Sequence, residues 1–78
     1  MTIRDFNWLS EYEQGYIILH ESQFIESRFD NNYKYDLYAV YMFWVEDTYD
    51  KSHNQIICMK SFVANETLDK YSNVPKVF

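Results

Sequence analysis

The fold of this chain is decided by the stretch Tyr33-Lys34-Tyr35-Asp36-Leu37-Tyr38-Ala39-Val40-Tyr41-Met42-Phe43-Trp44-Val45-Glu46. Its odd positions are apolar or aromatic without interruption, whereas its even positions are polar at the two ends and apolar in the middle. Because side chains on a strand alternate between faces, this pattern predicts a central strand with one face fully covered and the other covered at its middle. Strands seldom reach this length, so we expect a bend or a start near Tyr35.

The residues before this stretch predict a helix followed by strands. Thr2 is a suitable N-cap for a helix over residues 3–13, because Ile3, Phe6 and Leu9 recur at helical spacing. Gly15, the one glycine of the chain, falls where a C-cap is expected. The next residues, 16–20, are β-branched and aromatic, which predicts a first strand.

Residues 21–29 fit two descriptions. Ile25, Ser27 and Phe29 alternate as on a strand, but the segment also fits a helical turn after a Ser22 cap. The strand is favoured, because residues 30–32 (Asp-Asn-Asn) suit a tight turn into the central strand, and a bulge near Ser22 would join it to the strand before.

The C-terminal third predicts a return strand and a short helix. We expect a polar loop over residues 47–53, an antiparallel strand over residues 54–63, a helix capped by Asn65 over residues 66–71, and a tail over residues 73–78.

Together these elements predict one α+β domain over residues 1–78. It is a two-layer domain with an N-terminal helix, an antiparallel meander of three to four strands and a short C-terminal helix that turns Leu68 and Tyr71 inward. If the helices cover one face of the sheet, Tyr38, Trp44 and part of the last strand are left on the other, either exposed or buried in a homodimer.

Charge is distributed unevenly along this chain of net charge -5. Residues 1–50 carry ten acidic side chains against three basic ones, and residues 51–78 carry two against four. This balance disfavours direct nucleic-acid binding, which needs clustered Lys and Arg, and favours a partner with a basic surface. The first residues show no basic segment followed by an apolar run, so we expect a cytoplasmic protein without a membrane anchor.

No residue pattern indicates catalysis or a cofactor. His20, His53 and Cys58 are the soft metal ligands of the chain, and their spacing matches no metal motif. Cys58 lies between Ile57 and Met59, which predicts a buried thiol rather than a nucleophile. We therefore expect no enzyme activity, no metal and no cofactor.

Aromatic and acidic side chains at the expected helix end and loop are the candidates for partner binding. Exposed Tyr beside carboxylates is typical of protein interfaces, although such Tyr can equally pack beneath its own loop and the acids can be a solvated face. Trp8 and Tyr16 belong to the same group of aromatics. The candidate partner-binding residues are Glu11, Tyr12, Glu13, Glu46, Asp47, Tyr49 and Asp50.

In composition the chain resembles the small inhibitors encoded by phages and other mobile elements. These include anti-CRISPR proteins, inhibitors of DNA-processing enzymes and immunity proteins of nuclease toxins. The resemblance lies in small size, acidity, many Tyr and few Gly, and no motif carries it. It implies a non-enzymatic inhibitor that binds a basic nucleic-acid-handling protein of the host cell and blocks its nucleic-acid site. The alternatives are a self-associating accessory module and an immunity protein.

Overall fold

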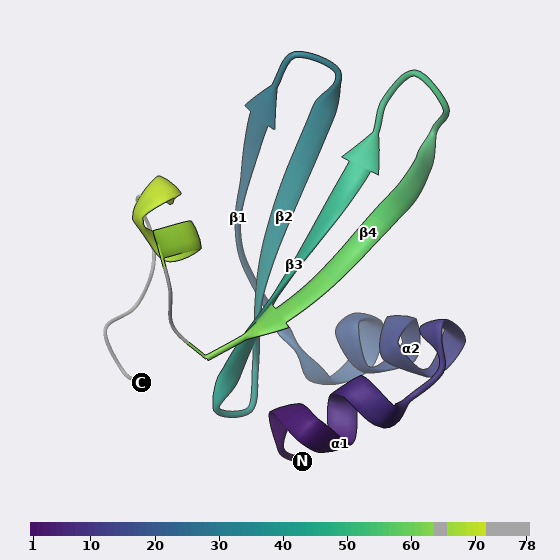
Figure 1. Cartoon of the computed structure of the whole chain (residues 1–78), viewed down its shortest axis with the longest axis vertical. Helices are drawn as coiled ribbons and strands as arrows, with labels where there is room; N and C mark the ends of the chain where they lie inside the picture. The colour runs from purple at the N-terminus through teal and green to yellow at the C-terminus, as the bar shows by residue number, and fades with distance from the viewer. Residues whose placement is uncertain (64–65, 72–78) are drawn as a thin grey trace.

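A four-stranded antiparallel sheet forms the centre of the computed structural model, which describes residues 1–63 and 66–71 (Figure 1). The strands follow one another in the sheet in their chain order, β1-β2-β3-β4. Two helices precede the sheet and a 3-10 helix follows it, so the expected α+β class and antiparallel meander are confirmed. The elements are α1 (Ile3–Trp8), α2 (Glu11–Glu21), β1 (Gln23–Asp30), β2 (Tyr33–Val40), β3 (Phe43–Asp50), β4 (Gln55–Phe62) and η1 (Glu66–Lys70).

The expectation of one long central strand is wrong, because residues 33–46 contain a hairpin. Val40 pairs with Phe43, which leaves Tyr41 and Met42 as a two-residue turn. Tyr41 adopts a φ of 54°, a left-handed conformation that Gly or Asn usually supplies in such turns. Both turn side chains are aromatic or apolar and exposed, so the alternating pattern of the sequence continues through the turn and contains no typical turn residue.

The other two hairpins turn at asparagines. Asn31 has a φ of 52° and Asn54 a φ of 53°, in agreement with the tolerance of Asn for this region. The expected turn after Asp30 is confirmed, as are strands over most of residues 21–29 and 54–63. The bulge of β1 lies between Phe24 and Glu26 rather than near Ser22.

The N-terminal region differs from the expectation of one helix followed by a strand. Thr2 caps α1 as expected, but α1 ends at Trp8 and Ser10 begins a second helix. Each helix starts with a capping box, in which the cap hydroxyl and an acidic side chain three residues later exchange hydrogen bonds with the backbone. α2 continues through Gly15 and through residues 16–20, so these residues are neither a C-cap nor a strand. The local cap outweighs the β-propensity of the Ile17-Ile18 pair.

Hydrophobic side chains are buried on both faces of the sheet. Phe6 and Ile17 from α1 and α2 pack against Val40, Phe43 and Val45. We call this the helical face of the sheet. It follows that α1 and α2 cover the end of the sheet near the β2–β3 turn, and Figure 1 shows the strands extending beyond them toward the other two turns.

The opposite face carries a second cluster, formed by Leu37, Trp44, Phe62 and Tyr71. Leu68 packs against it, so the inward orientation of Leu68 and Tyr71 is confirmed. The helices therefore do not share one face, because Tyr71 follows η1 on the side away from α1 and α2. Trp44 is buried here and is not part of an exposed surface. The expected Asn65 cap and the tail over residues 73–78 lie outside the described residues.

Candidate functional site

The three candidate residues at the start of α2 lie together on the surface. Glu11, Tyr12 and Glu13 form the first turn of this helix and are exposed. Glu13 also has a structural role, since its carboxylate accepts a hydrogen bond from the backbone N–H of Ser10. Hydrogen bonds from Ser10 lower the pKa of Glu13, which keeps this surface negatively charged.

The four candidate residues on β3 lie elsewhere, and the expectation of a polar loop from residue 47 is wrong. β3 continues to Asp50, and its side chains alternate between the two faces of the sheet. Glu46 and Asp50 therefore point to one face, and Asp47 and Tyr49 to the other. Glu46, Asp47 and Asp50 are buried, so the seven candidate residues do not form one acidic surface.

Glu46 belongs to a buried polar cluster beside η1. Its Oε2 accepts a hydrogen bond of 2.6 Å from the hydroxyl of Tyr71 and lies 3.6 Å from Nη2 of Arg28. The guanidinium of Arg28 stacks on the ring of Tyr35, 4.0 Å from its centroid. Burial and the carboxylate of Glu46 raise the pKa of Tyr71. This arrangement gives Glu46 a structural role in attaching Tyr71 to the sheet.

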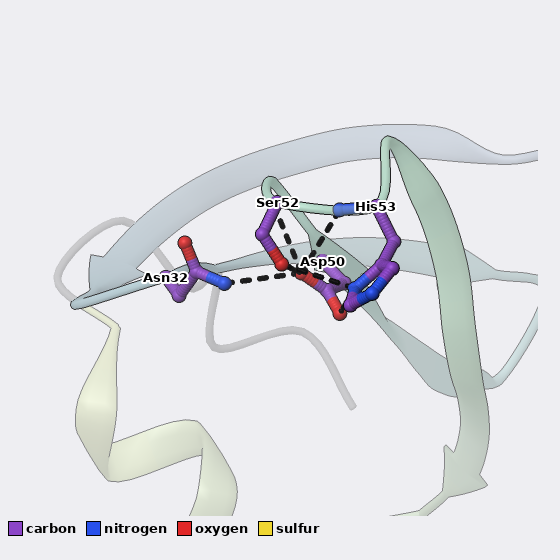
Figure 2. A network of polar contacts seen from close by, with 4 residues as sticks. All are labelled: Asn32, Asp50, Ser52 and His53. Atoms are coloured by element: carbon purple, nitrogen blue, oxygen red, sulfur yellow. Dashed lines mark hydrogen bonds and ion pairs between the residues drawn. The ribbon is translucent and has the colours of Figure 1, made fainter.

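Asp50 organises the turns at the far end of the sheet, as Figure 2 shows. Its Oδ1 accepts hydrogen bonds from the backbone N–H and the hydroxyl of Ser52, at 2.9 and 2.7 Å, and from the side-chain amide of Asn32 at 3.2 Å. Its Oδ2 lies 2.8 Å from Nδ1 of His53. The bonds from Ser52 and His53 lower the pKa of Asp50 to about 2. Asp50 therefore joins the turn at residues 51–54 to the neighbouring turn.

Asp47 lies opposite Asp36, a second carboxylate that the sequence analysis does not identify as a site residue. The register of the hairpin pairs Asp47 with Asp36, and the two residues are 3% and 7% exposed. The hydroxyl of Ser27 donates a hydrogen bond to Oδ1 of Asp36, and Nζ of Lys34 lies 3.6 Å from the same oxygen. Oδ1 of Asp47 is buried and has no hydrogen-bond partner among the described residues.

The proximity of the two carboxyl groups changes the protonation of Asp47. Burial, a hydrogen bond with Asp36 and the charge of Asp36 raise the pKa of Asp47 to about 7, against an ordinary value of 3.8. Lys34 and Tyr38 act in the opposite direction but are weaker. Burial and Asp47 together raise the pKa of Tyr38 to about 12. At neutral pH the pair of aspartates therefore holds a proton for part of the time.

A partly open pocket of about 480 Å³ lies between α2 and the helical face of the sheet, next to Asp47. Ile18 and Leu19 from α2 line it on one side, and Tyr38, Ile56 and Met59 line it on the sheet. Gly15 also lines it, and a Cβ at this position would meet open space. Among the described residues that line the pocket, Asp47 is the one that can carry charge at neutral pH.

Exposed aromatic and aliphatic side chains follow the outer face of α2, which we define as Tyr12, Tyr16 and Leu19. These side chains are 84%, 54% and 77% exposed, and their spacing of four and three residues places them in one row. Trp8, at the end of α1, is 83% exposed. The sequence indicates the aromatics but not Leu19, because residues 16–20 favour a strand by their own propensity and only the helix α2 places Leu19 in one row with Tyr12 and Tyr16.

The soft ligands do not come together. His53 contacts Asp50, and the ring of His20 lies against Tyr16 with centroids 4.3 Å apart. Cys58 is exposed rather than buried, because it lies on the edge strand β4. Over residues 1–63 and 66–71, no group of three or more His, Cys, Asp or Glu side chains is arranged to hold a metal ion. Within the same residues, no helix has the length and apolar character needed to cross a bilayer.

No protein-family model, curated protein or solved structure matches this chain.

Proposed function

We propose that this chain is a small non-enzymatic inhibitor that binds a basic nucleic-acid-handling protein through the outer face of α2 and blocks its nucleic-acid site. The composition described above supports a phage or mobile-element origin and a role in counter-defence of the anti-CRISPR kind. The partner surface differs from the one expected from sequence, because Glu46, Asp47 and Asp50 are buried and have structural partners or lie in the pocket.

The observation that carries the proposal is the row of exposed side chains on α2. Tyr12, Tyr16 and Leu19 are large side chains that no element of the described chain covers. Large aromatic side chains supply most of the binding energy at protein interfaces, and polar residues surround them. Glu11 and Glu13 lie beside the row and provide that acidic border.

The overall charge of the chain supports a basic partner. A net charge of -5 on 78 residues repels nucleic acid and attracts the positively charged groove of a protein that binds it. An inhibitor of this kind needs no catalytic group, since occupancy of the groove is sufficient. Association is then expected to be faster at low salt than at high salt.

A capture and competition experiment tests the proposal. The chain is immobilised, the proteins it retains from a lysate of the host cell are identified, and each is assayed for nucleic-acid binding with and without the free chain. We expect one basic nucleic-acid-binding protein to be retained and its nucleic-acid binding to be lost at one equivalent of the chain. Retention without loss of nucleic-acid binding would contradict the inhibitory mechanism.

Variants identify the surface that binds. Combined Tyr12→Ala and Tyr16→Ala substitutions should abolish retention and competition, because they remove the exposed aromatic rings of the outer face of α2. The matched control combines Phe29→Ala and Met42→Ala, which remove exposed apolar side chains at other places in the fold. Equal loss in both variants would show that the outer face of α2 is not the binding surface. A retained nuclease toxin would favour an immunity protein.

Self-association through β4 is a second candidate function. β4 is an edge strand, and its side chains of Ile56 and Ile57 are exposed, so its free backbone groups can pair with a second copy. Size-exclusion chromatography with light scattering measures the mass in solution. A dimer that becomes a monomer on Ile57→Lys substitution supports this function, and a monomer at all concentrations contradicts it.

A further inference from the structure

We propose that the pocket beside Asp47 is a binding site for a cation on an aliphatic stem, namely the side chain of an arginine presented by the partner protein. This inference rests on the proposed function for its partner and deepens it by naming the group that the partner inserts. Three features of the pocket support this inference: a buried hydrogen-bond acceptor without a partner, apolar walls, and a negative charge on ionised Asp47 that a cation neutralises.

The unpartnered acceptor is Oδ1 of Asp47. A buried carboxylate oxygen that makes no hydrogen bond has lost its hydration without compensation, and such atoms are rare in native proteins. A guanidinium group has five N–H donors in a planar arrangement and satisfies a carboxylate better than any other side chain. Supplying the missing donor is therefore the chemistry that this pocket selects.

The walls suit the stem of such a side chain. Ile18, Leu19, Phe24, Ile56 and Met59 present carbon to the pocket, and three methylene groups of an arginine would lie against them while the head reaches Asp47. Met59 is the register partner of Asp47 on β4. Its unbranched side chain can move aside to admit the head, because contact with Oδ1 requires displacement of the atoms over it.

The charges that face Asp47 come from β2 alone. Asp36 and Lys34 are the charged groups near it, and Tyr38 carries a phenol. Ser22 and the lining residues of α2, β1 and β4 carry no charge. When Asp47 gives up its proton, the two carboxylates and Lys34 leave one net negative charge, and a bound guanidinium neutralises it. Below pH 7, binding is then coupled to release of up to one proton.

Nuclear magnetic resonance titration of the isolated chain tests the site without the partner. The probe is n-butylguanidinium, and the matched neutral probe is n-butylurea, which has the same shape and no charge. We expect millimolar binding of n-butylguanidinium, with amide shifts at Ile18, Asp47 and Ile56, and affinity that rises up to tenfold per pH unit below pH 7 and levels off above it. Equal shifts with n-butylurea, or no shifts with either probe, would overturn the inference.

Two variants and a peptide complete the test. Asp47→Asn and Ile56→Lys should each weaken the affinity for n-butylguanidinium at least tenfold. Ile56→Lys places a competing cation beside the pocket, at an exposed position that tolerates substitution. Unchanged binding in a folded variant would contradict the site. A capped Ala-Arg-Ala peptide should shift the same amides, and binding of the free probe without the peptide would exclude a protein-borne arginine.

The outcome is separable from the proposed function. If the probe fails to bind while the α2 variants still abolish partner retention, the inference is wrong and the inhibitor proposal stands. If the probe binds and no partner is inhibited, the pocket is a cation site of a protein with another role.

Discussion

Asp36 and Asp47 lie directly opposite one another on β2 and β3, and both are buried on the helical face of the sheet. Two like charges in adjacent cross-strand positions are unfavourable, and burial adds to the cost. The raised pKa of Asp47 is the consequence, since the pair avoids the second charge by keeping a proton. This relationship makes the stability of the fold depend on pH.

Asp47→Asn should remove that dependence. The folded-state pKa of Asp47, about 7, lies above the ordinary value of 3.8, so the contribution of Asp47 to stability is fully present below about pH 4 and is lost as pH rises to 7. The loss is of the order of a few kcal/mol. Asparagine cannot ionise, so the variant should be the more stable protein at pH 8.

Urea unfolding at a series of pH values between 3 and 8 measures this effect. Asp30→Asn is the control, because Asp30 is exposed at the end of β1. A difference in unfolding free energy between the wild type and Asp47→Asn that stays constant from pH 4 to pH 7 would refute the prediction.

Asp50→Ala should destabilise the turns at the far end of the sheet. The variant loses the bonds to Ser52, Asn32 and His53, so we expect a lower melting temperature at pH 7. The pKa of Asp50 is lowered to about 2, so its contribution is present above about pH 4 and is lost as pH falls toward 2. The difference in melting temperature between the variant and the wild type should therefore be larger at pH 7 than at pH 2, and an equal difference at both pH values would argue against this role.

Tyr71→Phe should weaken the packing of Tyr71 against the sheet. The change removes the hydroxyl that donates to Oε2 of Glu46 and leaves a buried carboxylate with Arg28 at 3.6 Å. We expect a loss of about 1–3 kcal/mol in the free energy of unfolding, the usual cost of an unsatisfied buried group. Chemical denaturation measures it. Tyr33→Phe, at an exposed position, is the control, and an equal effect in both would show that the bond to Glu46 is not responsible.

Gly15→Ala should stabilise the protein. Gly15 lies inside α2 with an ordinary helical backbone, and an added Cβ meets no atom within 4 Å. Alanine is favoured over glycine in a helix interior by roughly 0.5–1 kcal/mol, so the free energy of unfolding should rise by about this amount. A decrease would show that α2 is not continuous through this residue. Circular dichroism during urea unfolding reports both helix content and stability.

The sequence predicted most of the sheet but not the site. Its alternation indicated strands over the residues of β2 and β3, the Asp-Asn-Asn of residues 30–32 indicated the turn between β1 and β2, and Tyr71 was expected to face inward. The turn at Tyr41 and Met42 could not be recognised, because it contains no Gly, Asn or Asp. The left-handed backbone conformation of Tyr41 cannot be predicted from its residue type.

That missed turn hid the pair of aspartates. On one continuous strand, Asp36 and Asp47 would lie about 36 Å apart at about 3.3 Å per residue. The hairpin folds them opposite one another, so the site depends on register, which alternation alone does not determine. The pocket was hidden for a similar reason, since it needs α2 where residues 16–20 favoured a strand by their own propensity.

The most direct measurement is a titration of the side-chain carboxyl carbon of Asp47 by carbon-13 nuclear magnetic resonance between pH 3 and pH 9. The structure predicts that the titration curve of Asp47 has its midpoint near pH 7. The curve should change when Asp36→Asn removes the neighbouring carboxylate. A midpoint near pH 4 in the wild-type protein, unaltered by Asp36→Asn, would contradict the pairing of the two aspartates and with it the site described above.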